Sequence, residues 1–510
     1  MTKMRKGIGL MVVVVALLLS ACNGGSKSST ASSSGTGSGE INISLSADPP
    51  NLDPARSSAL VDRQVQNSIF DKLFDLDPKG NIVPLLVDKY EVTEDGKEYT
   101  FHLKKDIKFQ DGTDFNAEAV KFNLDRYRAE GTNRTSELQF VQDVEAVDPL
   151  TVKVKLSKTF SPFLSILTDR SGMMGSPAAI EKEGDQFGNN PVGTGPFVFE
   201  EHVKGDHVSL VKNKEYWNGE PKLDKVTFKI FTNGTSAVQN LKTGKLDFID
   251  AVPIKEAKAL ENDPNFSLIA KSSMAYRGFY LNTTKAPLDN KYLREAVAEA
   301  VDRKAIAKVA FDNYAEPNNS PFYPGNLAYG DSGEFNQPDT KKVKELLKKG
   351  GKPNGFSFTM QIDTSPASET VGSVVQSMLE KQGIKVNLEK VEFGTLLDNA
   401  DKGNFEGLMN GWSGRPDPDQ SFYAFVVTGQ SNNYSRISNK ELDQLAEDAR
   451  TEIDPEKRKQ LYDQAMEIVH DEAGYVYLYS DFNRFGLSKK IKGFVYNSDG
   501  IIRTADLSKQ

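Results

Sequence analysis

Residues 356–388 read FSFTMQIDTSPASETVGSVVQSMLEKQGIKVNL, and this stretch decides the class of fold. Apolar and polar side chains alternate at its start, which is typical of a β-strand. Apolar residues then recur at helical spacing from Val371 to Leu379, and the alternation returns at Ile384. Gly383 is placed to end the helix. A strand, helix, strand unit predicts parallel pairing through a right-handed crossover, and therefore an α/β fold.

The loop GWSGRPDPDQSF, residues 411–422, follows the next expected strand, FEGLMNGW. Open α/β sheets gather their ligands at the carboxyl ends of strands, so this loop is a candidate binding site. Trp412 offers an apolar wall and Arg415 a planar cation that can grip a carboxylate. Asp417 or Asp419 could receive an amine. The alternative is structural: Trp412 belongs to the core, the aspartates cap turns, or Arg415 pairs with one of them.

Two further local signals lie in the first half of the chain. Asp95-Gly96 is a favoured hairpin turn, and the residues on both sides of it alternate between apolar and polar. Asn116 is suited to cap a helix that begins just after it. Both signals are consistent with a mixed α/β chain.

The N-terminus predicts export. Basic residues precede an apolar run that is too short to favour a membrane-spanning helix, which indicates a signal peptide over residues 1–21. Cys22 follows directly and is the only cysteine, so we expect it to be the lipidated first residue of a bacterial lipoprotein. The Gly- and Ser-rich residues 22–40 then form a flexible tether. With one cysteine, no intramolecular disulfide can stabilise the exported fold.

Charge and composition argue against several classes of function. The formal net charge is −8 and there are no basic clusters, which disfavours a nucleic-acid partner. The four histidines, His102, His202, His207 and His470, show no metal-ligand spacing. Ser413 lies in G-W-S-G-R, where an arginine replaces the last glycine of a hydrolase nucleophile motif. We therefore expect no enzyme activity, no metal and no cofactor.

Several segments together resemble a known family. PVGTGPFVF at 191–199 is followed by LVKNKEYWNGEPKLDKVTF, and LNTTKAPLDNKYLREAVAEAVDRKAI lies at 281–306. DPPNLDPA near the start and NYAEPNNSPFYPG at 313–325 add to the likeness. In this order the motifs resemble the large extracytoplasmic solute-binding proteins of the peptide, nickel, opine and glutathione class, the ligand-capturing subunits of ABC importers.

The resemblance implies a two-lobed periplasmic-binding-protein clamp with an additional inserted subdomain. The first lobe would combine residues 41–75, 190–283 and 477–510, the inserted subdomain would be 76–189, and the second lobe 284–476. Ligand would be enclosed by hinge closure and the closed form presented to permease subunits in the membrane. We expect a monomer, held by its lipid anchor on the outer face of the bacterial cytoplasmic membrane.

The resemblance also bears on the ligand. In the family's dipeptide and oligopeptide binders, the loop after the matching tryptophan carries an aspartate that pairs with the ligand's α-amino group, and Arg415 occupies that position here. A cation there repels an ammonium and attracts a carboxylate. The expected ligand is thus a small peptide or an anionic peptide-like solute of the glutathione or opine type. The alternatives are a peptide-sensing or chaperone-like binding protein without import, and a metal-chelate carrier.

Overall fold

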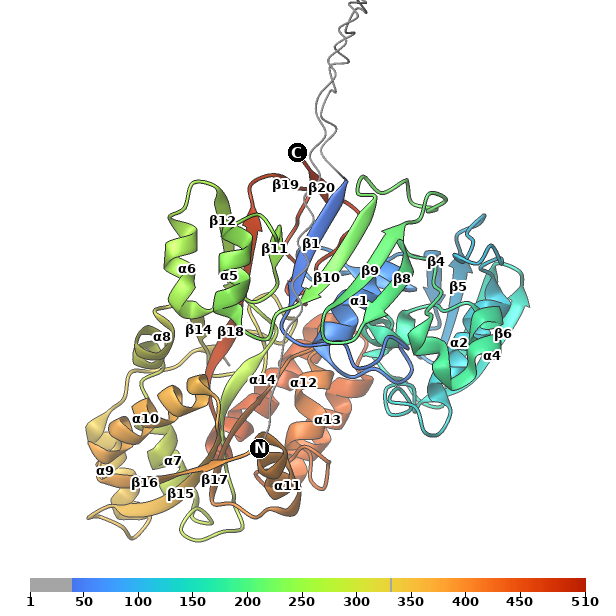
Figure 1. Cartoon of the computed structure of the whole chain (residues 1–510). Coiled ribbons are helices and arrows are strands. Elements are labelled where there is room, and N and C mark those ends of the chain that lie inside the picture. Colours follow the sequence, from blue (N-terminus) through green and yellow to red (C-terminus); the bar gives the residue numbers. More distant parts are fainter. Residues whose placement is uncertain (1–38, 331–332) are drawn as a thin grey trace, which may run out of the picture. The chain divides into compact units, whose positions relative to one another are not determined.

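The computed structural model describes residues 39–330 and 333–510 (Figure 1). The predicted signal peptide, Cys22 and the tether up to residue 38 lie outside the described residues. Within the described ranges, no helix combines the length and the apolar character needed to cross a membrane.

One large mixed sheet organises most of the chain. Its strands run in the order β16-β15-β17-β13-β18-β11-β1-β10-β9-β8, and β12 and β14 also pair with β18. We call the strands up to β12 that belong to this sheet its β1 side: β1 Glu40–Leu45, β8 Phe197–Val203, β9 His207–Lys212, β10 Lys225–Ile230, β11 Phe248–Ile249 and β12 Phe266–Ser272. The β1 side is accompanied by α1 Leu60–Ile69, α5 Gly234–Lys242, α6 Ile254–Glu261 and the small pair β19 Ile491–Lys492 and β20 Ser508–Lys509.

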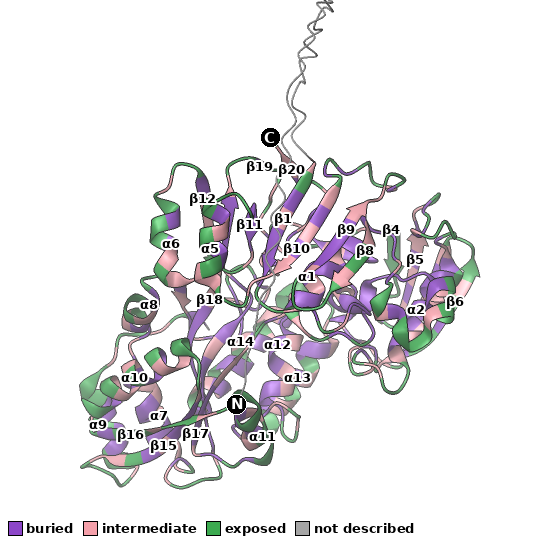
Figure 2. Cartoon of the chain, in the orientation of Figure 1, coloured by how far each residue is buried: buried purple, intermediate pink, exposed green. Residues whose placement is uncertain are grey.

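The other part of the sheet, its β13 side, holds the stretch that decides the fold. Its strands are β13 Tyr276–Leu281, β14 Ala315–Pro317, β15 Phe356–Asp363, β16 Ile384–Val391 and β17 Gly407–Trp412. Its helices are α7 Lys291–Glu299, α8 Arg303–Phe311, α9 Thr340–Lys349, α10 Pro366–Glu380, α11 Phe393–Lys402, α12 Asp419–Val426, α13 Lys440–Thr451 and α14 Pro455–Glu472. Figure 2 shows that the helices of this side expose their outer faces.

The predicted strand, helix, strand unit is confirmed as β15, α10 and β16. β15 and β16 are parallel, with Phe356 opposite Ile384, and β17 is parallel to β15. Helix α10 ends three residues before Gly383, which lies in a tight turn with φ +83° and donates its N–H to Glu380 O at 3.0 Å. Since L side chains rarely adopt that φ, glycine is suited to the turn that leads into β16. The loop after Trp412 leaves the carboxyl end of β17, as predicted.

Strand β18, Tyr475–Ser488, connects the two sides of the large sheet. Its first residues pair with β13 and its last residues pair with β12, both antiparallel. Between β12 and β13 the chain crosses beside β18, where Ser273 N donates to Asp481 O at 2.8 Å. Two strands therefore run next to each other from one side of the sheet to the other (Figure 1).

A separate four-stranded sheet has the order β4-β5-β7-β6 and its own hydrophobic core. Its elements and neighbours are β2 Phe74–Leu76, β3 Ile82–Pro84, β4 Val87–Val92, β5 Glu98–Leu103, β6 Val141–Asp148, β7 Thr151–Leu156, α2 Ala117–Arg128, α3 Phe163–Ile166, α4 Pro177–Glu183 and the 3-10 turns Arg170–Gly172 and Gly184–Asn189. The predicted hairpin is confirmed, since β4 and β5 pair across Asp95-Gly96. Asn116 caps α2 as expected, its Oδ1 accepting from Ala119 N at 3.0 Å.

Gly193 and Gly195 serve the fold by close approach. A Cβ at Gly193 would lie 2.3 Å from the carbonyl oxygen of Ile69, and one at Gly195 would lie 2.6 Å from the same atom. Both glycines therefore let the chain pass directly against the end of α1. Nearby, the side chains of Tyr216 and Trp217 donate to the buried carboxylate of Asp71 at 3.0 and 2.7 Å, so these two aromatic residues also have structural partners.

Candidate functional site

Two adjoining cavities lie beside the loop that follows β17. The smaller measures about 170 Å³ and its lining includes four arginines but only two carboxylates. The arginines are Arg63, Arg170, Arg277 and Arg415, and the carboxylates are Asp481 and Asp499. The larger cavity measures about 920 Å³ and shares Arg277 and Asp481 with the smaller one. The arrangement suits a solute with a negatively charged end and a bulkier remainder.

Arg415 projects over the indole of Trp412. Its guanidinium carbon lies 4.9 Å from the ring centroid, a distance typical of a cation–π contact. Nη1 donates to Ser413 Oγ at 3.0 Å and to Gly414 O at 2.7 Å, so the loop's own backbone holds the side chain in place. Burial lowers the pKa of Arg415 from its ordinary value, and the charge of Asp169 opposes that change. An arginine guanidinium is not deprotonated in proteins, so Arg415 stays charged and can bind an anion.

The ion pair of Arg415 is incomplete. Its Nε lies 3.9 Å from Asp169 Oδ2, at the outer limit of a salt bridge. That same oxygen accepts from Arg63 Nη1 at 2.7 Å. Because Arg63 holds the Asp169 carboxylate closely, a ligand anion could bind Arg415 without breaking a short ion pair.

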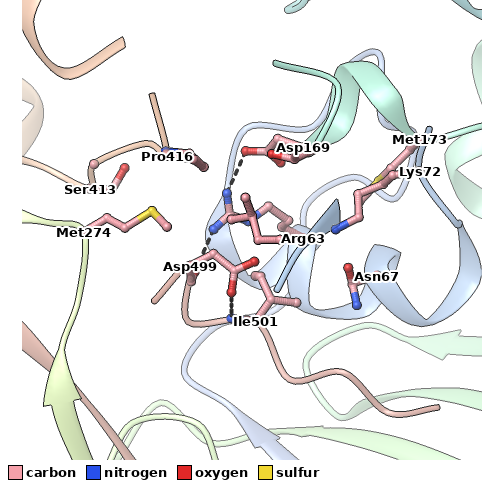
Figure 3. A pocket seen from close by; sticks show the side chains of 13 residues that line it. Arg63, Asn67, Lys72, Asp169, Met173, Met274, Ser413, Pro416, Asp499 and Ile501 are labelled. Atoms are coloured by element: carbon pink, nitrogen blue, oxygen red, sulfur yellow. Dashed lines mark hydrogen bonds and ion pairs between the residues drawn. The ribbon is translucent and has the colours of Figure 1, made fainter. Parts of the chain in front are cut away.

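Asp169 and Arg63 form the floor of a third, narrower cavity of about 20 Å³ (Figure 3). Figure 3 shows Arg63 between Asp169 and Asp499, with Ser413, Pro416 and Met274 opposite. Burial alone raises the pKa of Asp169, but the charges of Arg63, Arg170 and Arg415 hold it well below its usual range. Asp169 is therefore a permanent anion that is already occupied by arginine.

Trp412 lies at the wall of the larger cavity, and its role as an apolar wall for a ligand stays a prediction. Its ring packs against Phe425 with centroids 5.2 Å apart, and its Nε1 is buried without a hydrogen-bond partner among the described residues. Other apolar side chains line the same cavity: Ile254, Tyr280, Phe311, Phe393, Leu397, Met409, Phe425, Tyr434, Leu478 and Tyr479. Trp412 therefore contributes its ring to a largely apolar cavity wall.

The structure gives Asp417 and Asp419 partners that the sequence did not indicate. Asp417 accepts two hydrogen bonds from Arg458 of α14, both at 2.7 Å. Asp419, at the start of α12, accepts two from Arg450 of α13 at 2.9 and 3.0 Å. All four side chains are buried. These pairs tie α12 to the two helices behind it, and the role of either aspartate as an acceptor for a ligand amine stays a prediction without support from this geometry.

Sequence reasoning did not find Arg63, Arg170, Arg277 or Asp481. No motif marks them, and they lie far apart along the chain. Arg277 interrupts an otherwise apolar strand, which is the one local signal that could have pointed to it. The pairing Arg415 with Asp417 or Asp419, weighed as the alternative, is not what the structure shows, since both aspartates are held by other arginines.

Comparisons with known proteins agree with this geometry. The model of a family described as bacterial extracellular solute-binding proteins, family 5, matches residues 81–434. The chain belongs to this family. Its members are solute-binding proteins of ABC importers, so this solute-binding protein acts outside the cytoplasm, and the family as such is not one of enzymes.

Individual relatives match over most of their length. A glutathione-binding protein, GsiB, from Escherichia coli O1:K1 / APEC is 34% identical and covers 89% of this chain and 91% of its own. Among solved structures, the ABC transporter-associated periplasmic binding protein DppA from Helicobacter pylori in complex with peptide STSA is 27% identical, covers 92% and 98%, and has a TM-score of 0.77. The binding protein AgaA in complex with agropinic acid from A. tumefaciens R10 is 27% identical, covers 92% and 99%, and has a TM-score of 0.78.

These likenesses establish the fold class. The protein is a two-lobed α/β clamp of the periplasmic-binding-protein type with an additional subdomain. Its family captures peptide-like solutes and works with ABC permeases. In the part of the chain that the structure describes, no group of three or more His, Cys, Asp or Glu side chains is placed to hold a metal ion.

Proposed function

We propose that this protein captures a small anionic peptide-like solute, of the glutathione or opine type, and delivers it to an ABC permease. The observation that carries the proposal is the excess of arginine over carboxylate in the cavity that Arg415 lines. Clefts lined by one sign of charge attract ligands of the opposite sign. Relatives named for glutathione binding and a structure holding agropinic acid support the same class of solute.

The solute would lie across both cavities. Its carboxylate would take the free side of the Arg415 guanidinium, whose planar fork suits bidentate binding. Its remaining atoms would occupy the 920 Å³ cavity along Trp412, where apolar walls exclude water. Native mass spectrometry of the protein purified from its host tests the proposal, which requires a co-purifying solute with at least one carboxylate. A cationic or uncharged solute would contradict it.

We place the lobes as the sequence suggested, with 41–75, 190–283 and 477–510 in the first, 284–476 in the second and 76–189 as the inserted subdomain. Two crossings support a division into two lobes: the chain passes from one side of the sheet to the other between Ser272 and Tyr276 and again between Tyr479 and Phe482. Strand β13 pairs with β17 of the β13 side, so the first crossing lies before the proposed boundary at residue 283. A hinge at these crossings would allow the lobes to close on the solute.

Closure leads to a measurable expectation. Saturating solute reduces the radius of gyration in small-angle scattering, because the lobes approach each other. It also raises the melting temperature, since the solute binds the native protein and not the unfolded chain; the gain is about 2.7 kcal/mol when the solute is present at 100 times its Kd. A melting temperature that rises while the radius of gyration stays constant would contradict a closing clamp.

Attachment to the membrane is the second expectation. We infer that Cys22 carries the lipid anchor and that the protein acts as a monomer. Cys22→Ala releases the protein from the membrane fraction into the soluble fraction, measured by fractionation and immunoblotting. Since a single acyl chain anchors only marginally, mass spectrometry of the wild-type N-terminus is expected to show more than one chain. Firm membrane retention of the variant would contradict the lipoprotein assignment, and Ser20→Ala serves as the matched control.

A further inference from the structure

The ion pair between Arg277 and Asp481 lies where the chain crosses between the two sides of the sheet. Arg277 Nε donates to Asp481 Oδ2 at 2.6 Å, joining β13 to β18. The backbone of Asp481 pairs across the crossing as well, its carbonyl accepting from Ser273 N at 2.8 Å. The side chains are 41% and 32% exposed, so both groups remain accessible to a ligand.

Arg277 and Asp481 both line the 170 Å³ cavity with Arg415 and the 920 Å³ cavity with Trp412. The pairing of β13 with β18 is irregular beside Arg277, because Leu478 of β18 has no opposite residue between Arg277 and Gly278. The charge of Asp481 raises the pKa of Arg277, which shows how closely the two groups interact.

Most other carboxylates at or beside these two cavities already have partners on both oxygens. Asp499 accepts from Arg503 and from Ile501 N, and Asp169 accepts from Arg63 and from Arg170 N.

Two carboxylates line only the larger cavity, and they differ in whether both of their oxygens have partners. Asp363 accepts from Ser365 N and Ser368 Oγ, whereas Glu392 uses Oε2 alone, for Gly394 N and Thr395 N. Glu392 does not line the Arg415 cavity. Asp481 does, and among the described residues its Oδ1 has no hydrogen-bond or ion-pair partner.

We propose that Asp481 Oδ1 accepts the ammonium group of the solute while Arg415 binds its carboxylate, so that the protein selects solutes bearing both groups at one end, as an amino acid does. This inference rests on the proposed function and narrows its substrate class. Asp417 and Asp419 are bound to Arg458 and Arg450, so the solute amine needs another acceptor. The inference assigns that role to Asp481 on strand β18. Arg277 acts as a positioning residue that holds Asp481 through its second oxygen.

Two probes that differ only in the amine test the inference. The probes are glutathione and its des-amino analogue, glutaryl-cysteinyl-glycine, which keeps both carboxylates. In calorimetric titration, wild type is expected to bind glutathione roughly 10- to 100-fold more tightly than the analogue, because a hydrogen bond between charged groups is lost. Asp481→Asn is expected to abolish this preference by weakening glutathione alone. Asp481→Glu is expected to restore part of it.

The outcomes separate the two claims. Equal affinity of wild type for both probes, or an unchanged preference in Asp481→Asn, overturns the amine assignment; if both probes still need Arg415, the proposed function stands. Failure of wild type to bind either probe overturns both. Asp398→Asn is the matched control, since it removes the same charge from the exposed helix α11, where the aspartate pairs only with Lys402 one turn away. Should Asp481→Asn fold poorly, Asp481→Glu and the wild-type preference still decide the matter.

Discussion

Arg415→Ala is expected to weaken binding of the cognate solute by roughly 2 to 5 kcal/mol, mostly through faster dissociation. The reason is that the variant leaves a ligand carboxylate in a cavity with no bidentate donor on that wall. Arg415→Lys is expected to recover only part of the affinity, because lysine keeps the charge but lacks the planar fork. Calorimetry gives the affinities, and stopped-flow fluorescence of Trp412, which lies 4.9 Å from the guanidinium, gives the dissociation rates.

The stability of the variant separates a binding role from a structural one. Among the described residues, the nearest carboxylate to Arg415 is that of Asp169, which lies 3.9 Å away and is held by Arg63. The free energy of unfolding of Arg415→Ala is therefore expected to change by no more than about 1 kcal/mol, because its ion pair is long and its carboxylate is already held by Arg63. Arg128→Ala, in α2, removes a partly exposed arginine away from both cavities and is the matched control. Unchanged affinity in Arg415→Ala would exclude a ligand contact.

Periodic sequence patterns predicted the elements well where burial is repeated along a segment. β15, α10 and β16 each present apolar side chains at regular spacing, so the period alone identifies them. The hairpin at Asp95-Gly96 and the helix cap at Asn116 each depend on a local backbone conformation that only a few residue types favour, so the sequence indicates them directly. Such signals need no knowledge of the rest of the fold.

Partners far apart in the sequence could not be predicted in this way. Arg458 reaches Asp417 only because α14 packs behind α12. The residues near either partner in the sequence do not indicate that the two side chains meet. One indirect signal exists: Arg458 shares a helix face with Tyr462, Ala465 and Met466, and an arginine on a buried face needs a carboxylate. It identifies the need for a partner but not which aspartate supplies it. Among the cavity arginines, Arg277 alone carries a local signal, because it interrupts an apolar strand.

The crossing strand shows the same limit. Residues 475–488 form one long strand with polar residues in its middle, and the structure divides its pairing between β13 and β12. The change of partner, and with it the position of Asp481 between two cavities, depends on how the lobes are connected. Local propensity does not report that connection. The resemblance to a two-lobed family predicts a lobe boundary at residues 476–477, and that boundary stays a prediction.

Asp417→Ala is expected to reduce the free energy of unfolding by about 3 to 5 kcal/mol, because it leaves the buried guanidinium of Arg458 without its counter-charge. The pair is bidentate at 2.7 Å, and both side chains are less than one-tenth exposed. Urea unfolding followed by circular dichroism measures the loss. The loss of stability in this variant arises because one charge of the pair stays buried without its partner. Removing both charges together is therefore a separate test.

The double variant Asp417→Leu with Arg458→Met is expected to recover most of the stability, since well-packed apolar side chains can replace a buried ion pair at little or no cost. Solute affinity measured on the same proteins then distinguishes the two roles considered for Asp417. A structural role predicts that the double variant binds solute nearly as wild type does, because Arg415, Trp412 and Asp481 are untouched. If Asp417→Ala is instead as stable as wild type and binds solute far more weakly, Asp417 faces the ligand, and the pairing with Arg458 is not what keeps it in place.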